Sequence, residues 1–367
     1  MKGVAKKHLE RWLRGYAAHL WRRARTPRPR GPRHVLFALC DHYEPGWGDA
    51  TSDLARSRVE RWAEDYPRLA SEFRDADGRP PRHSFFFPGE QYTKHALDEL
   101  GRLAAAGLGE VELHLHHDRD TAERLKKSLG EYVQTYARHG HFTRGHDGKP
   151  RYAFIHGNWC LANSRSDGRY CGVDAELPLL FESGCYADFT FPSAPDETQP
   201  NIVNQIYWPL GDLWQPRAHE HGTASRVGQL RHDRILMIQG PLALVRRPSQ
   251  LGIRIESAAL TAKDPGTPSR IRSWIDQGIH VAGRPEWTFV KVHTHGAPEA
   301  QAAALLGDAG RAMHRELCTR YNDGSDFVLH YVTAREMFNI AFAAMAGERG
   351  NPHDFRNYAL LPPPVAA

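Results

Sequence analysis

Histidine and aspartate residues are concentrated in one short stretch of this sequence, from Glu110 to Thr121. Three histidines and two aspartates occupy seven consecutive positions there: His114, His116, His117, Asp118 and Asp120. Burying so many polar groups is costly unless a cation or a proton-transfer reaction compensates for the lost water. The first half alternates like a strand and the segment after Thr121 follows a helical pattern. Because α/β folds place their chemistry where a strand ends and a helix begins, a metal centre is the first hypothesis.

Similar polar groups follow other apolar runs of strand length. They are Asp41, His42 and Glu44; Glu90; His156 and Asn158; Asp188; and His293 and His295. In a parallel barrel the carboxyl ends of all strands meet on one face, so we expect these groups to converge. Imidazole and carboxylate are the usual ligands of Zn²⁺ and other first-row divalent ions. We therefore predict a divalent metal ion, with Zn²⁺ as the first choice, chelated by His114 with His116 or Asp118.

Each of these residues also has an ordinary structural explanation. A single histidine at a strand end is more often a hydrogen-bonded core or capping residue than a ligand. Asp118 and Asp120 could cap the next helix, and Asp188 could do the same or stabilise a turn. Glu44 and Glu90 could be solvated loop carboxylates. The convergence of five strand ends favours a functional site over this set of separate explanations.

Strand and helix patterns alternate through most of the chain. Short apolar runs typical of strands occur at 34–40, 84–87, 110–115, 152–156, 186–191, 288–293 and 327–331. Helical patterns follow at 53–74, 94–106, 120–138, 174–183, 298–320 and 334–346. This alternation predicts an α/β fold, in which residues 33–350 form one (β/α) barrel of seven or eight mostly parallel strands. We interpret the irregular segment at about 195–260 as an insertion and residues 351–367 as a proline-rich tail.

Residues 1–32 differ in composition from the rest of the chain. Eleven Lys or Arg and one Glu lie in residues 1–33, whereas the remainder has 37 basic and 42 acidic residues. Apolar residues at helical spacing predict a basic amphipathic helix over 4–23, followed by a Pro/Arg linker. Such a helix could lie on an anionic membrane surface or dock its apolar face on the body. Because the basic charge does not continue into the body, no nucleic-acid partner is expected.

The sequence has no run of about 18 apolar residues and no secretory signal pattern. Its five cysteines include no Cys-x-x-Cys pair, which argues against a disulfide scaffold and favours free, structural thiols. We therefore expect a cytoplasmic protein, with the N-terminal helix as its point of peripheral contact with the inner face of the membrane.

With these motifs identified, the chain resembles the polysaccharide deacetylase superfamily over most of residues 33–345. The family's first motif ends a strand with an acidic pair and is matched here by Cys40-Asp41-His42. The resemblance implies that Asp41 is the general base and that His42 takes the place of the metal-binding partner. The family's second motif, Glu-Ile-Gly-x-His-x-x-x-His, is matched by residues 110–118, with His114 as one ligand and Asp118 in the second histidine position. The implied fold is a distorted seven-stranded (β/α) barrel.

The family's late motif is an apolar strand ending in a histidine that protonates the leaving group. It resembles residues 289–296 here, so the resemblance assigns that role to His293 or His295. The segment 154–159 takes the place of the motif that shapes the sugar groove. Trp159, Trp208 and Trp214 could stack on sugar rings or simply pack in the core or rim. The predicted substrate-binding residues are Glu90, His156, Asn158, Trp159 and Asp188.

The resemblance implies a metal-dependent hydrolase that removes an acyl group, most simply acetyl, from a sugar or polysaccharide. Two other functions stay open. One is a glycosidase that uses a pair of carboxylates drawn from Asp41, Glu44, Glu90 and Asp188. The other is a non-catalytic sugar-binding barrel, held by its N-terminal helix to a membrane-bound polysaccharide assembly.

Overall fold

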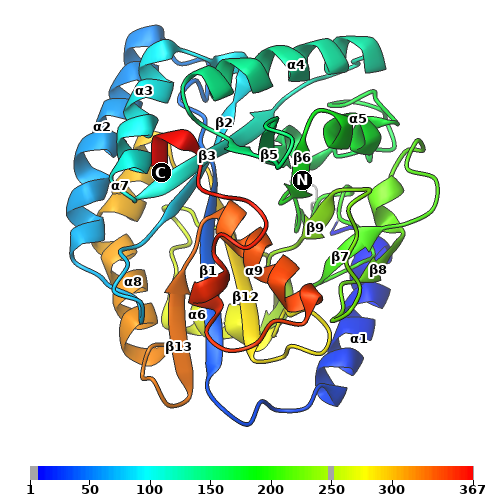
Figure 1. The fold of residues 1–367 in the computed structure, drawn as a ribbon, viewed down its shortest axis with the longest axis vertical. Helices are drawn as coiled ribbons and strands as arrows, with labels where there is room; N and C mark the ends of the chain where they lie inside the picture. The colour runs from blue at the N-terminus through cyan, green and yellow to red at the C-terminus, as the bar shows by residue number, and fades with distance from the viewer. Residues whose placement is uncertain (1–6, 247–251, 367) are drawn as a thin grey trace.

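The computed structural model describes residues 7–246 and 252–366, which form a mixed α/β fold (Figure 1). The helices are α1 Leu9–Arg25, α2 Ser52–Ser71, α3 Lys94–Ala105, α4 Ala122–Arg138, α5 Glu176–Glu182, α6 Pro268–Asp276, α7 Glu299–Leu306, α8 Asp308–Arg320 and α9 Ala334–Ala346. The strands are β1 Arg33–His42, β2 His83–Pro88, β3 Gly109–Leu115, β4 Thr143–Arg144, β5 Pro150–His156, β6 Cys185–Asp188, β7 Ile206–Pro209, β8 Gly222–Ala224, β9 Leu236–Ile238, β10 Ala243–Arg246, β11 Ile253–Glu256, β12 Trp287–Thr294 and β13 Phe327–Tyr331. Short 3-10 turns lie at Gly89–Gln91, Gly157–Trp159, Ala218–Glu220, Pro352–Phe355 and Pro364–Ala366.

A mostly parallel sheet runs through the centre of the molecule. Its strands follow the order β12-β1-β2-β3-β5-β6-β9-β7-β8, while β13 pairs with β1 and β4 with β5. Every neighbouring pair from β12 to β9 is parallel. The register sets Cys40 of β1 beside His293 of β12, and His42 beside Phe86 of β2. The carboxyl ends of the parallel strands therefore share one edge, as the alternation of strands and helices predicted.

The sheet does not close into the predicted barrel through any pairing among residues 7–246 and 252–366. Closure would require β12 to pair with β9, at the other end of the parallel run. Instead, the segment around Ala258 and Leu260 occupies the outer edge of β12. Leu260 N donates to the carbonyl oxygen of His293 at 2.7 Å, and His293 N donates to that of Ala258 at 3.1 Å. Because these backbone groups are already paired, β12 has no free edge there for β9.

The two faces of the sheet are covered differently. Side chains of α2, α3, α4 and α7 pack with Phe85, Phe87 and Leu113 on one face. On the opposite face, buried residues of α9 pack with Leu36, Ala38 and Phe86. Figure 1 shows α9 lying in front of β1 and β12. Nearly every residue of α9 is buried, so this helix is packed tightly against that face of the sheet.

Threonine caps explain where four of the predicted helices begin. Thr51, Thr93, Thr121 and Thr333 each precede a helix, and each Oγ1 accepts a hydrogen bond from the backbone N three residues later at 3.2–3.3 Å. Such bonds satisfy N–H groups that have no partner within the helix. The helix predicted at 298–320 is divided into α7 and α8 at Gly307, whose backbone is extended. The short helix α6 was missed by the sequence pattern.

The N-terminal helix α1 is docked on the body of the protein. Trp12, Tyr16 and His19 are buried, and Trp12 and Tyr16 pack with Val203 and Leu242. Gly15 allows this close approach, because a Cβ there would lie 1.5 Å from the carbonyl oxygen of Asn201. The structure therefore shows the docked alternative for this face. Residues 4–6 of the predicted 4–23 helix lie outside the described residues.

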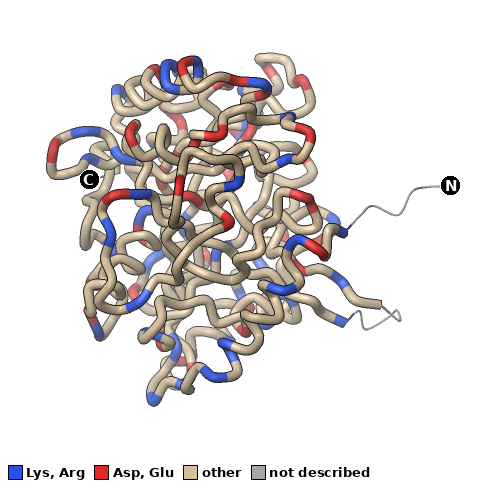
Figure 2. Tube along the Cα trace, turned by 90° about the vertical axis from the view of Figure 1, so that its right-hand side faces the viewer, with Lys and Arg blue, Asp and Glu red and all other residues tan. Residues whose placement is uncertain are grey.

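A second apolar stripe of α1 remains exposed. It consists of Leu9, Leu13, Leu20 and Trp21. The guanidinium of Arg25 lies 3.6 Å from the Trp21 ring centroid, and Arg22 and Arg23 are in the same last turn. In the part of the chain that is described, no helix combines the length and apolar character needed to cross a membrane. Figure 2 shows basic and acidic residues interspersed over that view of the molecule.

The predicted tail is packed against the fold at residues 351–366. Asn339 Nδ2 of α9 donates to the carbonyl oxygens of Arg356 and Leu360 at 2.7 and 2.8 Å. Val365 N then donates to the carbonyl oxygen of Gly140, at the end of α4, at 3.0 Å. Figure 1 shows this red segment running from α9 to the C-terminus beside α3. The tail therefore ties α9 to the helices on the other face of the sheet.

Candidate metal centre

The ends of β1, β3 and β12 bring a group of histidines to one face of the sheet. Paired residues of parallel neighbours point to the same face, so the register places His42, His114 and His293 together. The ring centroids of His42 and His114 are 4.9 Å apart, and those of His42 and His295 are 4.7 Å apart. The predicted convergence of these strand ends is therefore present in the fold.

Glu44, just beyond the end of β1, lies at the centre of this group. Its Oε1 is 3.3 Å from His114 Nε2, 3.7 Å from His295 Nε2 and 3.8 Å from His116 Nε2. One donor atom from each of His42, Glu44 and His114 lies within 4.8 Å of the others. All three side chains are buried. The sequence analysis counted Glu44 among the strand-end carboxylates but did not assign it as a ligand.

The hydrogen bonds at this centre leave electron pairs facing one another. His114 Nδ1 donates to the carbonyl oxygen of Ile155 at 2.8 Å, so a neutral His114 presents a lone pair on Nε2. That lone pair faces Glu44 Oε1. Among residues 7–246 and 252–366, neither of these atoms has a hydrogen-bond partner, and the buried His42 Nε2 has none either. Two acceptors this close repel unless a cation or a proton lies between them. The arrangement fits a bound divalent cation.

Burial determines the protonation of the two histidines in this group. Burial, followed by the nearby histidines, lowers the pKa of His42 well below its ordinary value. Burial chiefly lowers the pKa of His114 to about 3. Both rings are therefore neutral near pH 7, which is the form that binds metals. Two neutral imidazoles and one carboxylate form the ligand set typical of catalytic zinc sites, which keep a further position open.

His116 and Glu90 form a pair at the margin of the centre. Glu90 Oε1 accepts hydrogen bonds from His116 Nδ1 at 2.6 Å and from His116 N at 3.2 Å. Burial lowers the pKa of His116, but the hydrogen bond to Glu90 and the charges of Glu44 and Glu90 outweigh it and raise the pKa overall. The side chain of His116 is 28% exposed, so its Nε2 lies between solvent and Glu44. A histidine held this way by a carboxylate can exchange protons with a substrate or with water.

His295 and His293 differ in their access to solvent. The His295 side chain is 26% exposed, and its ring centroid lies 5.0 Å from that of Trp47 and 6.5 Å from that of Trp159. His293 is buried, and its Nδ1 has no hydrogen-bond partner. Of the two histidines proposed as proton donor, His295 is the one placed beside the exposed Trp47 and the half-buried Trp159.

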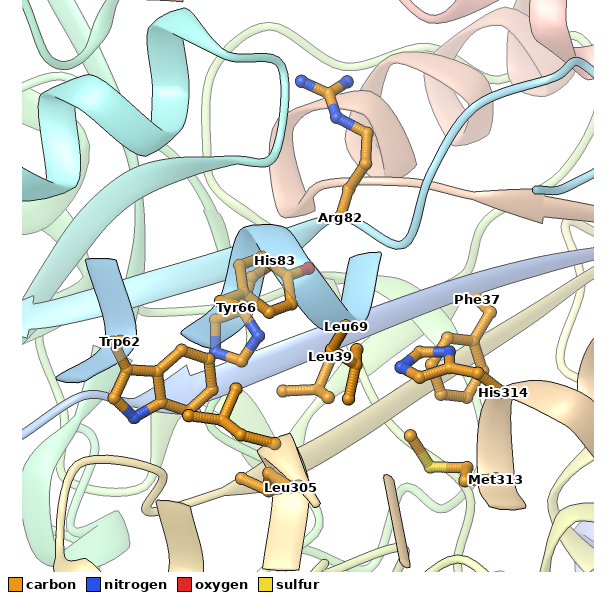
Figure 3. Close-up of a pocket in the computed structure, with 11 residues that line it drawn as sticks. Phe37, Leu39, Trp62, Tyr66, Leu69, Arg82, His83, Leu305, Met313 and His314 are labelled. Carbon is orange, nitrogen blue, oxygen red and sulfur yellow. The ribbon is translucent and has the colours of Figure 1, made fainter. Parts of the chain in front are cut away.

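Asp41 points to the opposite face of β1 from His42. Its Oδ2 accepts a hydrogen bond from His83 Nε2 at 2.9 Å, and its Oδ1 accepts one from Gly296 N at 2.6 Å. Trp62 Nε1 also donates to the carbonyl oxygen of Gly296 at 3.0 Å. Figure 3 shows His83 near Trp62 and Tyr66 at a small cavity behind the centre, with Arg82 turned away. Asp41 therefore holds the turn that carries His295.

The remaining predicted residues do not all lie at this centre. Asn158 is exposed, and Trp159 is half-buried with its ring centroid 6.4 Å from that of His42, so both lie toward the open side. Asp118 Oδ1 instead accepts a hydrogen bond from Tyr170 N at 2.5 Å. The buried carboxylate of Asp188 accepts hydrogen bonds from Thr190, and burial raises its pKa to about 7. His156 is fully buried and faces Glu176, away from this group.

Neither a family model nor a curated protein matches this chain in the comparisons with known proteins.

Proposed function

We propose that this protein is a metal-dependent hydrolase that removes an acyl group, most simply acetyl, from a sugar or polysaccharide. The observation that carries the proposal is the buried group of His42, Glu44 and His114, whose unpaired donor atoms face one another. A divalent ion held there, with Zn²⁺ as the first choice, would polarise the acyl carbonyl and lower the pKa of water. His116 and His295, two proton-exchanging groups, border this centre on its solvent side.

The side chains around the centre have separate roles in the proposal. His116, held by Glu90, accepts a proton from the attacking water. His295 donates a proton to the leaving group of the sugar. Trp47 and Trp159 offer ring faces for stacking on the sugar. Asp41 has both carboxylate oxygens engaged, so we assign it the positioning of His295 in place of general base.

The polysaccharide deacetylase resemblance supports the same reaction. Its motifs at 40–42, 110–118 and 289–296 lie at the ends of β1, β3 and β12, which contribute to one centre. In this proposal the parallel run from β12 to β9 is a distorted (β/α) barrel opened between its first and last strands. The ligand set would differ from the family's, because Glu44 takes the place predicted for Asp118.

Metal content and hydrolysis measured on the same sample test the proposal. The protein should carry a transition metal and release acetate from acetylated chitooligosaccharides, acetylated xylo-oligosaccharides or p-nitrophenyl acetate. His114→Ala should lose one metal equivalent and reduce hydrolysis to background. His139→Ala is the matched control, because His139 bonds to Asp98 and Tyr92 away from the centre.

Three results would contradict the proposal. Full metal occupancy in His114→Ala would remove this histidine from the ligand set. Cleavage of a glycosidic bond that persists after chelation would support the paired-carboxylate glycosidase, because that reaction needs no metal. Binding of glycans without turnover of any acylated sugar would support the non-catalytic barrel.

We also propose that the protein acts in the cytoplasm at the inner face of the membrane, with α1 as the contact. Leu9, Leu13, Leu20 and Trp21 are exposed although an adjoining face of α1 is docked. Basic residues lie in the same helix, so an anionic lipid surface matches both the apolar and the charged side chains. The docked face and the membrane-facing stripe are different sides of one helix.

A further inference from the structure

A second group of metal-binding side chains lies on the other face of β5. It consists of His117, His156, Cys171 and Glu176, and one donor atom from each lies within 4.8 Å of the others. Glu176 Oε1 is 3.1 Å from His117 Nε2 and 3.4 Å from His156 Nε2, and Glu176 Oε2 is 3.5 Å from Cys171 Sγ. We propose that these four residues bind a structural Zn²⁺ ion. This centre is separate from the proposed hydrolase centre and does not depend on it.

The hydrogen bonds of His156 point to a cation. Its Nδ1 donates to the carbonyl oxygen of Gly157, so a neutral ring presents a lone pair on Nε2. That Nε2 is buried, has no hydrogen-bond partner within the described part of the chain, and faces the carboxylate of Glu176. Two acceptors in contact in a fully buried site repel one another. A Zn²⁺ ion between them would bind both lone pairs and remove this repulsion.

The composition of the group favours zinc over a simple ion pair. Two imidazoles, one thiolate and one carboxylate supply four ligands, the number typical of structural zinc sites. Zn²⁺ with one thiolate and one carboxylate has no net charge, which makes a buried centre less costly. His156, Cys171 and Glu176 are all buried, so no position is left open for water or substrate. A closed set of this kind stabilises a fold and does not catalyse a reaction.

The segment that such an ion would hold lies between β5 and α5. Residues 160–175 contain no helix or strand, and five non-glycine residues from 158 to 170 have left-handed φ angles: Asn158, Trp159, Ala162, Asn163 and Tyr170. Those conformations are unfavourable for most side chains and need support from the surrounding structure. His156 and Glu176 lie at the two ends of this loop and Cys171 lies within it. An ion bound to all three would fix the loop and place Trp159 beside the first centre.

Cobalt substitution tests this site separately, because only the second centre contains a thiol. The metal-free protein reconstituted with Co²⁺ should show a thiolate-to-cobalt charge-transfer band in the near ultraviolet. Cys171→Ser should lose that band and one metal equivalent, whereas Cys160→Ser should keep both. Cys160 is the matched control, because it is also buried in this loop but its Sγ contacts the carbonyl oxygen of Asn158.

The two proposals fail in different ways. His114→Ala should keep the cobalt band while losing hydrolysis, so a failure of the hydrolase proposal leaves this one standing. Absence of the band in cobalt-loaded wild-type protein would overturn the second site, even if Cys171→Ser cannot be folded. A band that persists in Cys171→Ser would overturn it as well. With either result, a proton shared between His156 and Glu176 would explain why these two side chains lie in contact.

Discussion

Asp41 is held from two directions, by a side chain and by the backbone. His83 donates to one carboxylate oxygen and the amide of Gly296 donates to the other. A Cβ at residue 296 would lie 2.1 Å from Asp41 Oδ2, so glycine is required for this contact. The turn that carries His295 therefore depends on a residue that does not face the metal centre. In the proposed reaction, Asp41 would act through His295.

Substitutions of Asp41 and His83 should consequently have similar effects on hydrolysis. Asp41→Asn and His83→Phe each remove a hydrogen bond to a charged group, worth about 1.5–3 kcal/mol. If the transition state loses this stabilisation and the bound substrate does not, turnover should decrease roughly 10- to 100-fold. The metal should be retained. Metal analysis and steady-state hydrolysis on the same samples measure both effects.

The comparison between the two variants separates positioning from base catalysis. A general base typically contributes about 10²–10⁴-fold. If Asp41→Asn loses that much while His83→Phe hydrolyses at nearly the wild-type rate, Asp41 is the base predicted from the sequence. A lower metal content in Asp41→Asn alone would instead make Asp41 a ligand.

At the scale of elements, α1 combines a docked face with an exposed one. His19 on the docked face is buried and bonds through Nε2 to Gln277 Oε1 at 3.2 Å. Burial, and then the charge of Arg22, lower the pKa of His19 to about 4. Because Gln277 Oε1 only accepts, the neutral ring donates this bond. Docking of α1 therefore favours uncharged His19.

The pH dependence of stability follows from that pKa. The pKa of His19 is about 6.5 when unfolded and about 4 when folded, so its contribution is complete above pH 6.5 and decreases as the pH falls toward 4. At about 1.4 kcal/mol per pKa unit, the loss is on the order of 1–3 kcal/mol. Urea unfolding of wild type and His19→Gln from pH 7 to pH 4 measures it. The stability difference should shrink or reverse with acidification; a constant difference would contradict the assignment.

The exposed stripe of α1 should control binding to anionic vesicles. Leu13→Asp with Trp21→Asp removes two apolar side chains and adds two negative charges, so affinity for phosphatidylserine vesicles should decrease at least about tenfold. Sedimentation with vesicles measures the bound fraction, and phosphatidylcholine vesicles control for charge. Leu361→Asp is a control, because Leu361 is an exposed apolar residue far along the chain from α1. Equal binding by wild type and the double variant would contradict membrane contact through this stripe.

At the scale of the whole molecule, a buried ionic network holds α9 to the sheet. Arg335 donates to both carboxylate oxygens of Glu110 at 2.8 and 3.0 Å. Its Nη1 also donates to the carbonyl oxygen of Leu360 in the tail at 2.7 Å. Glu336 binds Arg82 and Arg356 beside this pair. The network joins β3, α9 and the tail, which are far apart in sequence.

Replacing Arg335 alone should lower the free energy of unfolding more than replacing Arg335 and Glu110 together. Arg335→Met leaves the buried Glu110 carboxylate with only Arg82, whose Nη2 is 3.7 Å from Glu110 Oε1, as a cationic neighbour. Removing one partner of a buried ion pair typically costs about 3–5 kcal/mol. The double variant with Glu110→Gln should recover a large part of that loss. Urea unfolding of the two single variants and the double variant gives the coupling energy. Additive effects would show that the pair does not stabilise the fold as a unit.

The residues from 114 to 117 show what local sequence determines. Alternation along a strand places His114 and His116 on one side and His117 on the other, and the sequence contains this pattern. The strand-helix order and the positions of His42 and His295 at strand ends also follow from local periodicity. These features depend on neighbours within a few residues, so a sequence pattern predicts them.

The partners of those side chains were decided only by the tertiary structure. The strand-end pattern predicted that Glu44 and His114 would converge, but not that the Glu44 carboxylate would contact His114. Nothing in the sequence pattern predicted that Glu176 would contact His117 and His156. Likewise, the two carboxylate oxygens of Asp41 accept hydrogen bonds from a residue of β2 and from the turn after β12. The 258–260 segment pairs with the edge of β12 that barrel closure would need. Such contacts depend on how distant segments pack. Strand periodicity determines which face a side chain takes, whereas three-dimensional packing determines what it meets there.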